Sequence, residues 1–230
     1  MLNDDDEEFV RAAGLVRPDQ RVVKVDGTGI DLDQFAFTPA PPGDLSFLLI
    51  ARLLREKGIL DFVEAARILK RDAPKCRFQL LGPLDSNPGA LSSDDVAAWR
   101  AENVVDYLGH TEDVRPFLRS CTTFVLPTYY REGLPRTVIE ALAIGRPVIT
   151  TGISACRQTT VDGVNGFVVP ERDPAALAAA MRRFIDDPSL AVRMGQASRH
   201  IAEKTFDVAK VNAVMMRTMS LQAGSPDEPV

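Results

Sequence analysis

The sequence predicts an α/β fold, with a parallel sheet of about six strands and helices on both faces. Short apolar runs of strand length alternate with amphipathic helical patterns along the chain. One unit shows this most clearly, because the apolar run Phe124–Leu126, the helical pattern Leu134–Ile144 and the apolar run Pro147–Thr151 follow one another. Two strands joined through a helix lie parallel, with a right-handed crossover. We therefore expect ligands at the carboxyl ends of the strands, where the loops and helix N-termini lie.

The other elements follow the same alternation. Further strands are expected at Arg21–Val25, Leu45–Ala51, Arg77–Leu81, Val104–Leu108 and Val164–Val169. Helices are expected from residue 2 through Val16, over Gly58–Arg71, from Ser92 or Ser93 to Ala101, and over Glu112–Arg119, Pro174–Ile185, Pro188–Lys204 and Phe206–Leu221. Thr111, Asp173 and either Ser92 or Ser93 are expected N-caps, because their side-chain oxygens accept hydrogen bonds from N–H groups of the first turn.

Length and composition limit the class of protein. The chain has 230 residues, 45% of them hydrophobic, which is ample for the core of one sizeable domain. It contains no run of about 18 apolar residues and no apolar leader behind Met1, so we expect no membrane span. A net charge of −5 with scattered basic residues argues against binding to nucleic acid. The three cysteines lack metal-site spacing, which favours buried reduced thiols in a cytoplasmic protein.

Two carboxylates mark the central unit as a candidate site. Glu132 is expected in its loop and Glu140 two turns inside its helix, about 12 Å further along the helix axis. That separation is too long for two carboxylates that share one proton or one metal ion. It suits a long ligand with a phosphate at the helix N-terminus, where free N–H groups and the helix dipole favour anions. A solvated turn residue and an exposed helix glutamate would give the same pattern, so both interpretations stay open.

A second strand-to-helix junction carries two cations, Arg52 and Lys57. Both follow the expected strand Leu45–Ala51, so they lie on the ligand side of the sheet. The planar fork of an arginine and the point charge of a lysine together suit a diphosphate. In the alternative interpretation they are solvated residues of a loop that also contains Arg55 and Glu56.

Three segments together resemble the retaining glycosyltransferases of family 4, which have the GT-B fold. EGLPRTVIEALAIGRPVITT (Glu132–Thr151) resembles the E-x7-E segment of that family. ARLLREKGILDFVEAARIL (Ala51–Leu69) resembles its R-x4-K segment, and VDGVNGFVVPERDPAALAAAM (Val161–Met181) the segment that closes its donor domain. The segments occur in the family's order and span roughly residues 30 to 220.

The resemblance implies roles for the candidate residues in glycosyl transfer from a nucleoside-diphosphate sugar, with retention of the anomeric configuration. Glu140 is expected to accept hydrogen bonds from the ribose hydroxyls, and Glu132 to contact hydroxyls of the sugar. The departing diphosphate is expected to be held by Arg52, Lys57 and the N–H groups of Gly133, Leu134 and Pro135. The backbone around Leu108 and His110 is the expected contact for the nucleotide base. No metal or other cofactor is expected.

The resemblance also divides the chain. GT-B enzymes have two Rossmann-like domains with the active site between them, and this chain resembles only the second. Residues 1–30 are therefore expected to be the last helix and strand of a missing N-terminal domain together with the hinge. Residues 31–222 are expected to form the nucleotide-sugar-binding domain, and residues 223–230 a disordered tail.

The implied partners are a nucleoside-diphosphate sugar, the missing N-terminal domain, and a glycan or lipid-linked acceptor. The wording YREGLPR (Tyr130–Arg136) resembles the branch that extends lipid-linked oligosaccharides and surface polysaccharides, often with uridine diphosphate donors. Any membrane contact, at the inner face, is expected through the missing half. Two alternatives stay open: half of a sugar-nucleotide epimerase or phosphorylase of the same architecture, and a stand-alone binding module without catalytic activity.

Overall fold

The computed structural model describes residues 4–17, 19–20, 22–23, 25, 27, 29–130 and 133–219. Its centre is a sheet of six parallel strands in the order β3-β2-β1-β4-β5-β6. The predicted fold class is thereby confirmed. The strands are β1 (Ser46–Ile50), β2 (Arg77–Leu81), β3 (Asp106–Tyr107), β4 (Thr123–Leu126), β5 (Val148–Thr151) and β6 (Gly166–Val169).

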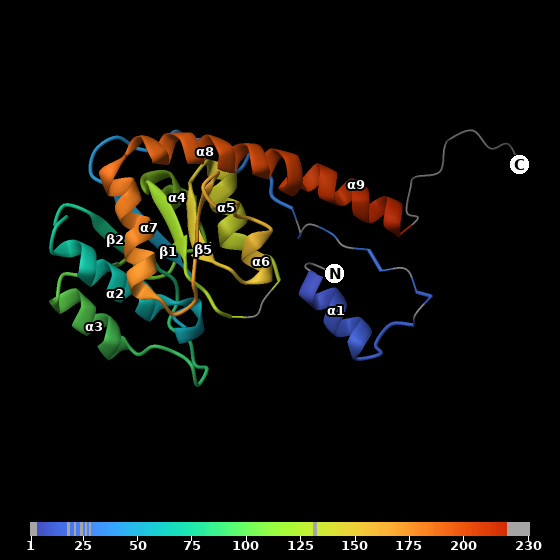
Figure 1. Cartoon of the computed structure of the whole chain (residues 1–230), viewed down its shortest axis with the longest axis horizontal. Helices are drawn as coiled ribbons and strands as arrows, with labels where there is room; N and C mark the ends of the chain where they lie inside the picture. Colours follow the sequence, from blue (N-terminus) through green and yellow to red (C-terminus); the bar gives the residue numbers. More distant parts are fainter. Residues whose placement is uncertain are drawn as a thin grey trace, which may run out of the picture.

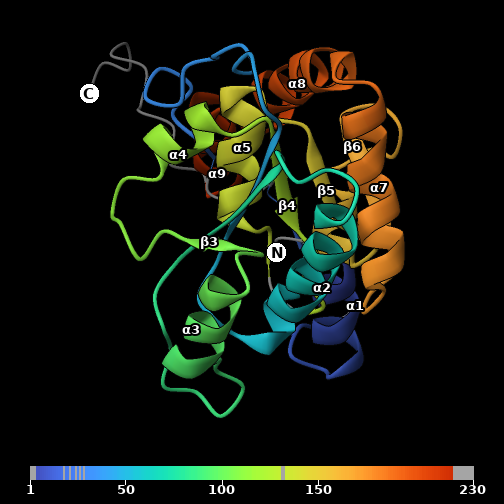
Figure 2. The same ribbon diagram turned by 90° about the vertical axis from the view of Figure 1, so that its left-hand side faces the viewer.

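Helices cover both faces of this sheet (Figure 1). On one face α2 (Ile59–Lys70) and α7 (Pro174–Asp186) pack against each other, and Figure 2 shows them side by side. On the other face α5 (Arg136–Ile144) packs against α8 (Ser189–Ile201). The remaining α-helices of the described residues are α1 (Asp4–Ala12), α3 (Ser93–Ala101), α4 (Arg115–Ser120), α6 (Ser154–Arg157) and α9 (Val208–Thr218). A short 3-10 helix spans Arg55–Lys57, and a short π-helix spans Ala202–Phe206.

Residues along each central strand alternate between two cores. Phe47 and Leu49 of β1 belong to the core under α2 and α7, whereas Leu48 and Ile50 belong to the core under α5. Successive side chains of a strand point to opposite faces of the sheet, and all four of these are buried. A strand buried on both faces needs a continuous apolar run, which explains the unbroken hydrophobic stretches in the sequence.

The strand order reverses direction between β1 and β4. From β1 the chain adds β2 and β3 toward one edge of the sheet, and β4 to β6 then extend it toward the other edge. At such a switch point the loops leaving two adjacent strands diverge and leave a crevice outside their carboxyl ends. This crevice is where the fold provides room for a ligand.

Three helices begin later than predicted, and one of them is α9, which begins at Val208 instead of Phe206. The helix α4 begins at Arg115 instead of Glu112, because Thr111 Oγ1 accepts the N–H of Asp113 at 3.1 Å and Asp113 Oδ1 accepts that of Arg115 at 3.0 Å. These local bonds hold the segment in a turn, so Thr111 is not an N-cap. The helix α5 begins two residues later than expected, after Pro135, since a proline disfavours helical backbone in the residue before it.

The other predicted boundaries are confirmed only in part. Ser92 and Asp173 cap α3 and α7 through their side chains, as predicted. The first helix ends at Ala12 and not at Val16, and Gly14 just beyond it is left-handed. Residues 22, 23 and 25 of the strand predicted at Arg21–Val25 lie in no strand. The predicted tail, residues 223–230, lies outside the described residues.

Segments near the two ends of the chain meet at Ile30. Its N–H donates to the carbonyl oxygen of Phe206 at 2.7 Å, and its carbonyl oxygen accepts the N–H of Val208 at 3.0 Å. From this contact α9 runs away from the sheet, and α1 stands apart from it (Figure 1). In the part of the chain that the structure describes, no helix is both long and apolar enough to cross a membrane.

Candidate functional site

A cavity of about 220 Å³ opens at the switch point, between the carboxyl ends of β1 and β4 and the first turn of α5. It brings together Arg52, Lys57 and Pro135, three residues that the sequence singled out. Its other lining residues are Ile50, Ala51, Leu126, Arg136 and Thr137. The place is the one at which open parallel sheets bind ligands, and the lining supplies three cationic side chains.

Lys57 ends the 3-10 turn after β1 and is only 8% exposed. Its Nζ lies 4.9 Å from the ring centroid of Tyr130. The next residue, Gly58, has a φ of +74°, and a side chain there would meet the carbonyl oxygen of Pro127 at 2.1 Å. A glycine is required here, because the loop after β1 packs directly on the loop after β4. The interpretation of Lys57 as a solvated loop residue is therefore wrong.

Arg52 follows β1 and pairs with an acid from the loop after β2. Its Nη1 lies 3.0 Å from Asp85 Oδ2, and its side chain is half-exposed. The N–H of Asn87, with the guanidinium of Arg52, holds the pKa of Asp85 below its usual range, so the carboxylate stays ionised. Arg52 therefore lines the cavity while it is bound to a fixed negative charge.

Glu140 is turned inward, because only 7% of it is exposed. Its Oε1 accepts a hydrogen bond from Arg136 Nε at 2.9 Å, one helical turn away. Burial raises the pKa of Glu140, and the guanidinium of Arg136 opposes that shift. The interpretation of Glu140 as an exposed helix glutamate is wrong. Among the described residues Arg136 is the only side-chain donor to this carboxylate, which leaves it room to accept hydrogen bonds from a ligand.

The first turn of α5 presents backbone N–H groups to the cavity. Pro135 is its N-cap, no side chain caps it, and no acidic residue lies in its first turn. The first N–H groups of a helix have no partner inside the helix and attract anions. Pro135 has no N–H, so the predicted set Gly133, Leu134 and Pro135 is wrong at that residue. Arg136 and Thr137 line the cavity beside Pro135 and have backbone N–H groups, and the position of Thr137 within the first helical turn could have identified it.

Leu108 and His110 lie just after β3, at the edge of the sheet. The backbone there continues the pairing with β2, since Leu108 N–H donates to Leu80 and the carbonyl oxygen of Gly109 accepts from Gly82, both at 2.8 Å. Neither Leu108 nor His110 lines the cavity at the switch point. Their contact with a base stays a prediction.

Glu132 lies outside the described residues. Its contact with a sugar and its separation from Glu140 therefore stay predictions. Within the described part of the chain, no group of three or more His, Cys, Asp or Glu side chains is arranged to hold a metal ion.

One family of known proteins matches most of the chain. Residues 32–201 match the family described as glycosyl transferases group 1. The N,N'-diacetylbacillosaminyl-diphospho-undecaprenol alpha-1,3-N-acetylgalactosaminyltransferase of Campylobacter jejuni is 27% identical over 85% of this chain and 53% of its own length. The capsular polysaccharide biosynthesis glycosyltransferase CapM of Staphylococcus aureus is 31% identical, over 68% of this chain and 41% of its own.

Glycogen synthase of Mycobacterium tuberculosis is 31% identical over 84% of this chain and 47% of its own. The chain thus spans about half the length of the curated relatives that it matches. Solved structures agree in fold. Anabaena Alr3699/HepE, in complex with UDP and glucose, has a TM-score of 0.79 at 21% identity, covering 96% of this chain and 62% of its own. The pneumococcal O-GlcNAc transferase GtfA, in complex with UDP and GlcNAc, has a TM-score of 0.77 at 21% identity, over 96% and 44% of the two chains.

Proposed function

Because the chain belongs to the family of group 1 glycosyl transferases and has the fold of the C-terminal GT-B domain, we propose that it binds the donor of a retaining glycosyltransferase. The observation that carries this proposal is the cavity at the switch point, where Arg52, Lys57 and the first turn of α5 meet. An arginine fork, a lysine and a helix N-terminus are groups that bind a diphosphate.

The proposed donor is a nucleoside-diphosphate sugar that supplies a hexosyl or N-acetylhexosaminyl group. UDP is the nucleotide we favour, since the HepE structure that shares the fold contains UDP and glucose. The proposed acceptor is a glycan or a lipid-linked saccharide, by analogy with the Campylobacter relative, which is named for a diphospho-undecaprenol acceptor, and with CapM, which is named for capsular polysaccharide biosynthesis. We place the reaction in surface polysaccharide or glycoconjugate synthesis on the cytoplasmic side of the membrane, with the acceptor bound mainly by a preceding GT-B domain.

In the proposed reaction the bond between the sugar and the diphosphate breaks, and negative charge develops on the departing phosphate oxygen. Arg52, Lys57 and the N–H groups at the start of α5 stabilise that charge, which is a large term in catalysis of this kind. Glu140 accepts hydrogen bonds from the ribose hydroxyls and so fixes the nucleotide along the helix. Glu132 contacts the sugar hydroxyls. The side chains supply the positive charge themselves, so the proposed reaction uses no metal ion.

Calorimetric titration of this chain with uridine, guanosine and adenosine diphosphates tests the proposal. We expect one of them, UDP first, to bind at a single site, with binding that survives a chelator. We expect the chain alone to transfer no sugar from the matching donor to a saccharide acceptor, because half of the cleft is absent from it. Binding of none of the three nucleotides would contradict the donor-binding role. Sugar transfer by this chain alone would contradict the proposal that a preceding domain is needed to bind the acceptor.

A further inference from the structure

Two ion pairs in the described part of the chain differ from the rest in how their acids are covered. The side chains of Asp85 and Glu140 are 11% and 9% exposed, whereas the acid in each of the other described pairs is 34% exposed or more. Their partners are Arg52 and Arg136, and both of these arginines line the cavity at the switch point. Among the described ion pairs, the two with covered carboxylates thus both hold an arginine of this cavity.

Asp85 is also held by a hydrogen bond within its own loop. Its Oδ1 accepts the N–H of Asn87 at 2.9 Å, which closes a tight turn, and its Oδ2 accepts from Arg52. Each carboxylate oxygen therefore accepts a hydrogen bond from a different donor. This arrangement fixes the carboxylate before any ligand arrives.

The loop that carries Asp85 is joined to the loop that carries Arg52. Leu53 N–H donates to the carbonyl oxygen of Pro83 at 2.9 Å, Arg55 N–H to that of Gly89 at 2.9 Å, and Leu91 N–H to that of Leu53 at 2.8 Å. A side chain on Gly89 would lie 2.7 Å from the carboxylate oxygens of Glu56, so the two loops are in direct contact. The ion pair therefore connects two loops that backbone hydrogen bonds already join.

We propose that Asp85 is a positioning residue that holds the guanidinium of Arg52 in the wall of the diphosphate cavity. This inference rests on the proposed function. Arg52 has several N–H donors in a planar fork, and Asp85 takes one of them at Nη1. The arginine lines the cavity while it is paired, so the pair and the ligand use different N–H groups of one side chain. A half-exposed arginine would lose conformational entropy on binding a diphosphate. Because Asp85 already orders the side chain of Arg52, less of that entropy remains to be lost when the ligand binds.

Asp85→Asn and Asp85→Ala separate the charge pair from the turn. Asparagine keeps an oxygen for the N–H of Asn87 but turns an NH2 group toward Arg52, whereas alanine removes both bonds. We expect UDP affinity to fall about three- to tenfold in either variant, the range that ordering one long side chain costs on binding. In an Arg52→Ala background the same two changes should have no effect, and uridine binding should not respond to them.

The matched control is Asp72→Asn, which breaks an exposed ion pair with Arg182 at 2.8 Å on another face of the domain. It should leave UDP affinity at the parent value. A rise of UDP affinity in Asp85→Asn would show that Asp85 competes with the phosphate, and would overturn the proposal. An equal loss in the presence and absence of Arg52 would do the same, because the effect would then come from the fold of the loop.

Relaxation of the Arg52 Nε–H group in ligand-free protein gives a readout that needs no nucleotide. We expect its order parameter to fall in Asp85→Asn and to stay at the parent value in Asp72→Asn. An Arg52 that is equally ordered with and without the Asp85 charge overturns the positioning role. If UDP binds to no variant and not to the parent, the proposed function fails, and this measurement still decides the inference.

Discussion

Lys57 and Glu140 are ionisable residues that the protein almost completely covers. Withdrawing a charge from water costs several kcal/mol unless partners compensate, so such groups are weak candidates for a purely stabilising role. Both lie where the candidate site is, Lys57 in the cavity wall and Glu140 one turn behind Arg136 on α5. At the scale of single residues, ionisable groups covered at a cavity are a mark of a binding or catalytic site.

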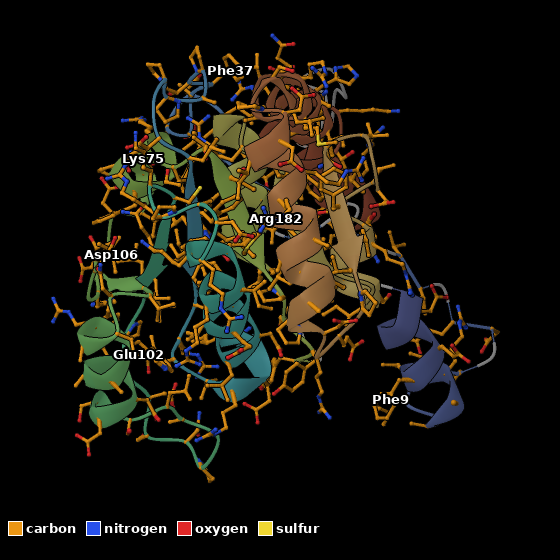
Figure 3. The ribbon with its side chains drawn as sticks, turned by 60° about the vertical axis from the view of Figure 1, so that its left-hand side comes forward. Phe9, Phe37, Lys75, Glu102, Asp106 and Arg182 are labelled. Carbon is orange, nitrogen blue, oxygen red and sulfur yellow. The ribbon has the colours of Figure 1, made fainter. Side chains whose placement is uncertain are left out.

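The basic pair gives the first prediction. Arg52→Ala or Lys57→Ala should weaken UDP binding by about 1.5–3 kcal/mol, the scale of a charge-assisted hydrogen bond. Uridine, which lacks the diphosphate, should bind equally to all variants. Titration calorimetry measures both. Lys75→Ala is the control, because Lys75 is an exposed lysine before the amino end of β2, away from the cavity (Figure 3). Parent-like UDP binding by both variants would show that the cations are not ligand contacts.

Glu140 gives the second prediction, in which binding and stability change in opposite directions. Burial raises the pKa of the folded carboxyl above 4.5, so the native state binds its proton more tightly than the unfolded state does. The resulting contribution to the free energy of unfolding is present at low pH and is lost as the pH rises through the folded pKa. Glu140→Gln has no carboxyl to ionise, so its stability does not fall in this way. At pH 7 the variant should be as stable as the parent or more stable.

The same variant should bind UDP more weakly and lose the preference for ribose over deoxyribose, since an amide accepts hydrogen bonds from hydroxyls less well than a carboxylate. Thermal melts at pH 4 and pH 7, with titrations of UDP and its 2'-deoxy form, test both parts. The stability of the variant relative to the parent should increase from pH 4 to pH 7. A variant that is less stable at pH 7 and still prefers ribose would contradict the assignment.

At the scale of elements, Arg146 ties two helix ends together. It is fully buried, and its guanidinium donates to the carbonyl oxygens of Leu118 at 2.7 Å and of Arg119 and Gly145 at 3.3 Å. These oxygens lie in the last turn of α4 and at the C-cap of α5, where a helix carries partial negative charge. Burial lowers the pKa of Arg146, and the carbonyl groups take the place of a carboxylate partner.

The third prediction is that Arg146→Met lowers the free energy of unfolding by about 3 kcal/mol, because several carbonyl groups lose their donor in a buried place. Arg146→Lys should recover part of the loss, as a lysine keeps the charge but not the planar fork. Equilibrium denaturation in urea measures both. The control Arg182→Met, at an exposed pair on α7 (Figure 3), should change stability by about 0.5 kcal/mol or less. A loss at Arg146 no larger than that of the control would contradict the role.

The elements also show what the sequence could predict. The strands were found from apolar runs, and Ser92 and Asp173 were found as caps, because both signals lie within a few adjacent residues. The start of α4 was missed, since the bonds of Thr111 and Asp113 compete with helix formation. Arg52 and Lys57 were singled out by their place after an expected strand and by the family resemblance. Asp85 lies in another loop, and only the folded structure brings it to Arg52. The burial of Glu140 depends in the same way on tertiary packing.

At the scale of the whole molecule, the residues that precede β1 in the sequence fall into two groups. Phe9 and Leu15 are 66% and 68% exposed, although both are large apolar side chains. Ile30 and Phe35 are 2% and 8% exposed and belong to the core under α5. The bonds between Ile30 and the start of α9 make this the point at which the chain joins the compact unit. The boundary that the resemblance implies, between residues 30 and 31, stays a prediction.

The boundary gives the fourth prediction, which compares two truncated chains. Removal of residues 1–26 takes away α1 and its exposed side chains, so the free energy of unfolding and the affinity for UDP should both stay near the parent values. Removal of residues 1–36 also takes away Ile30 and Phe35, each worth about 1.5–3 kcal/mol when fully buried. That chain should unfold at markedly lower urea concentration or fail to fold. Urea denaturation and UDP titration of both chains test the boundary. A shorter truncation that is as damaging as the longer one would show that α1 belongs to this domain, and equal stability of both would move the boundary beyond Phe35.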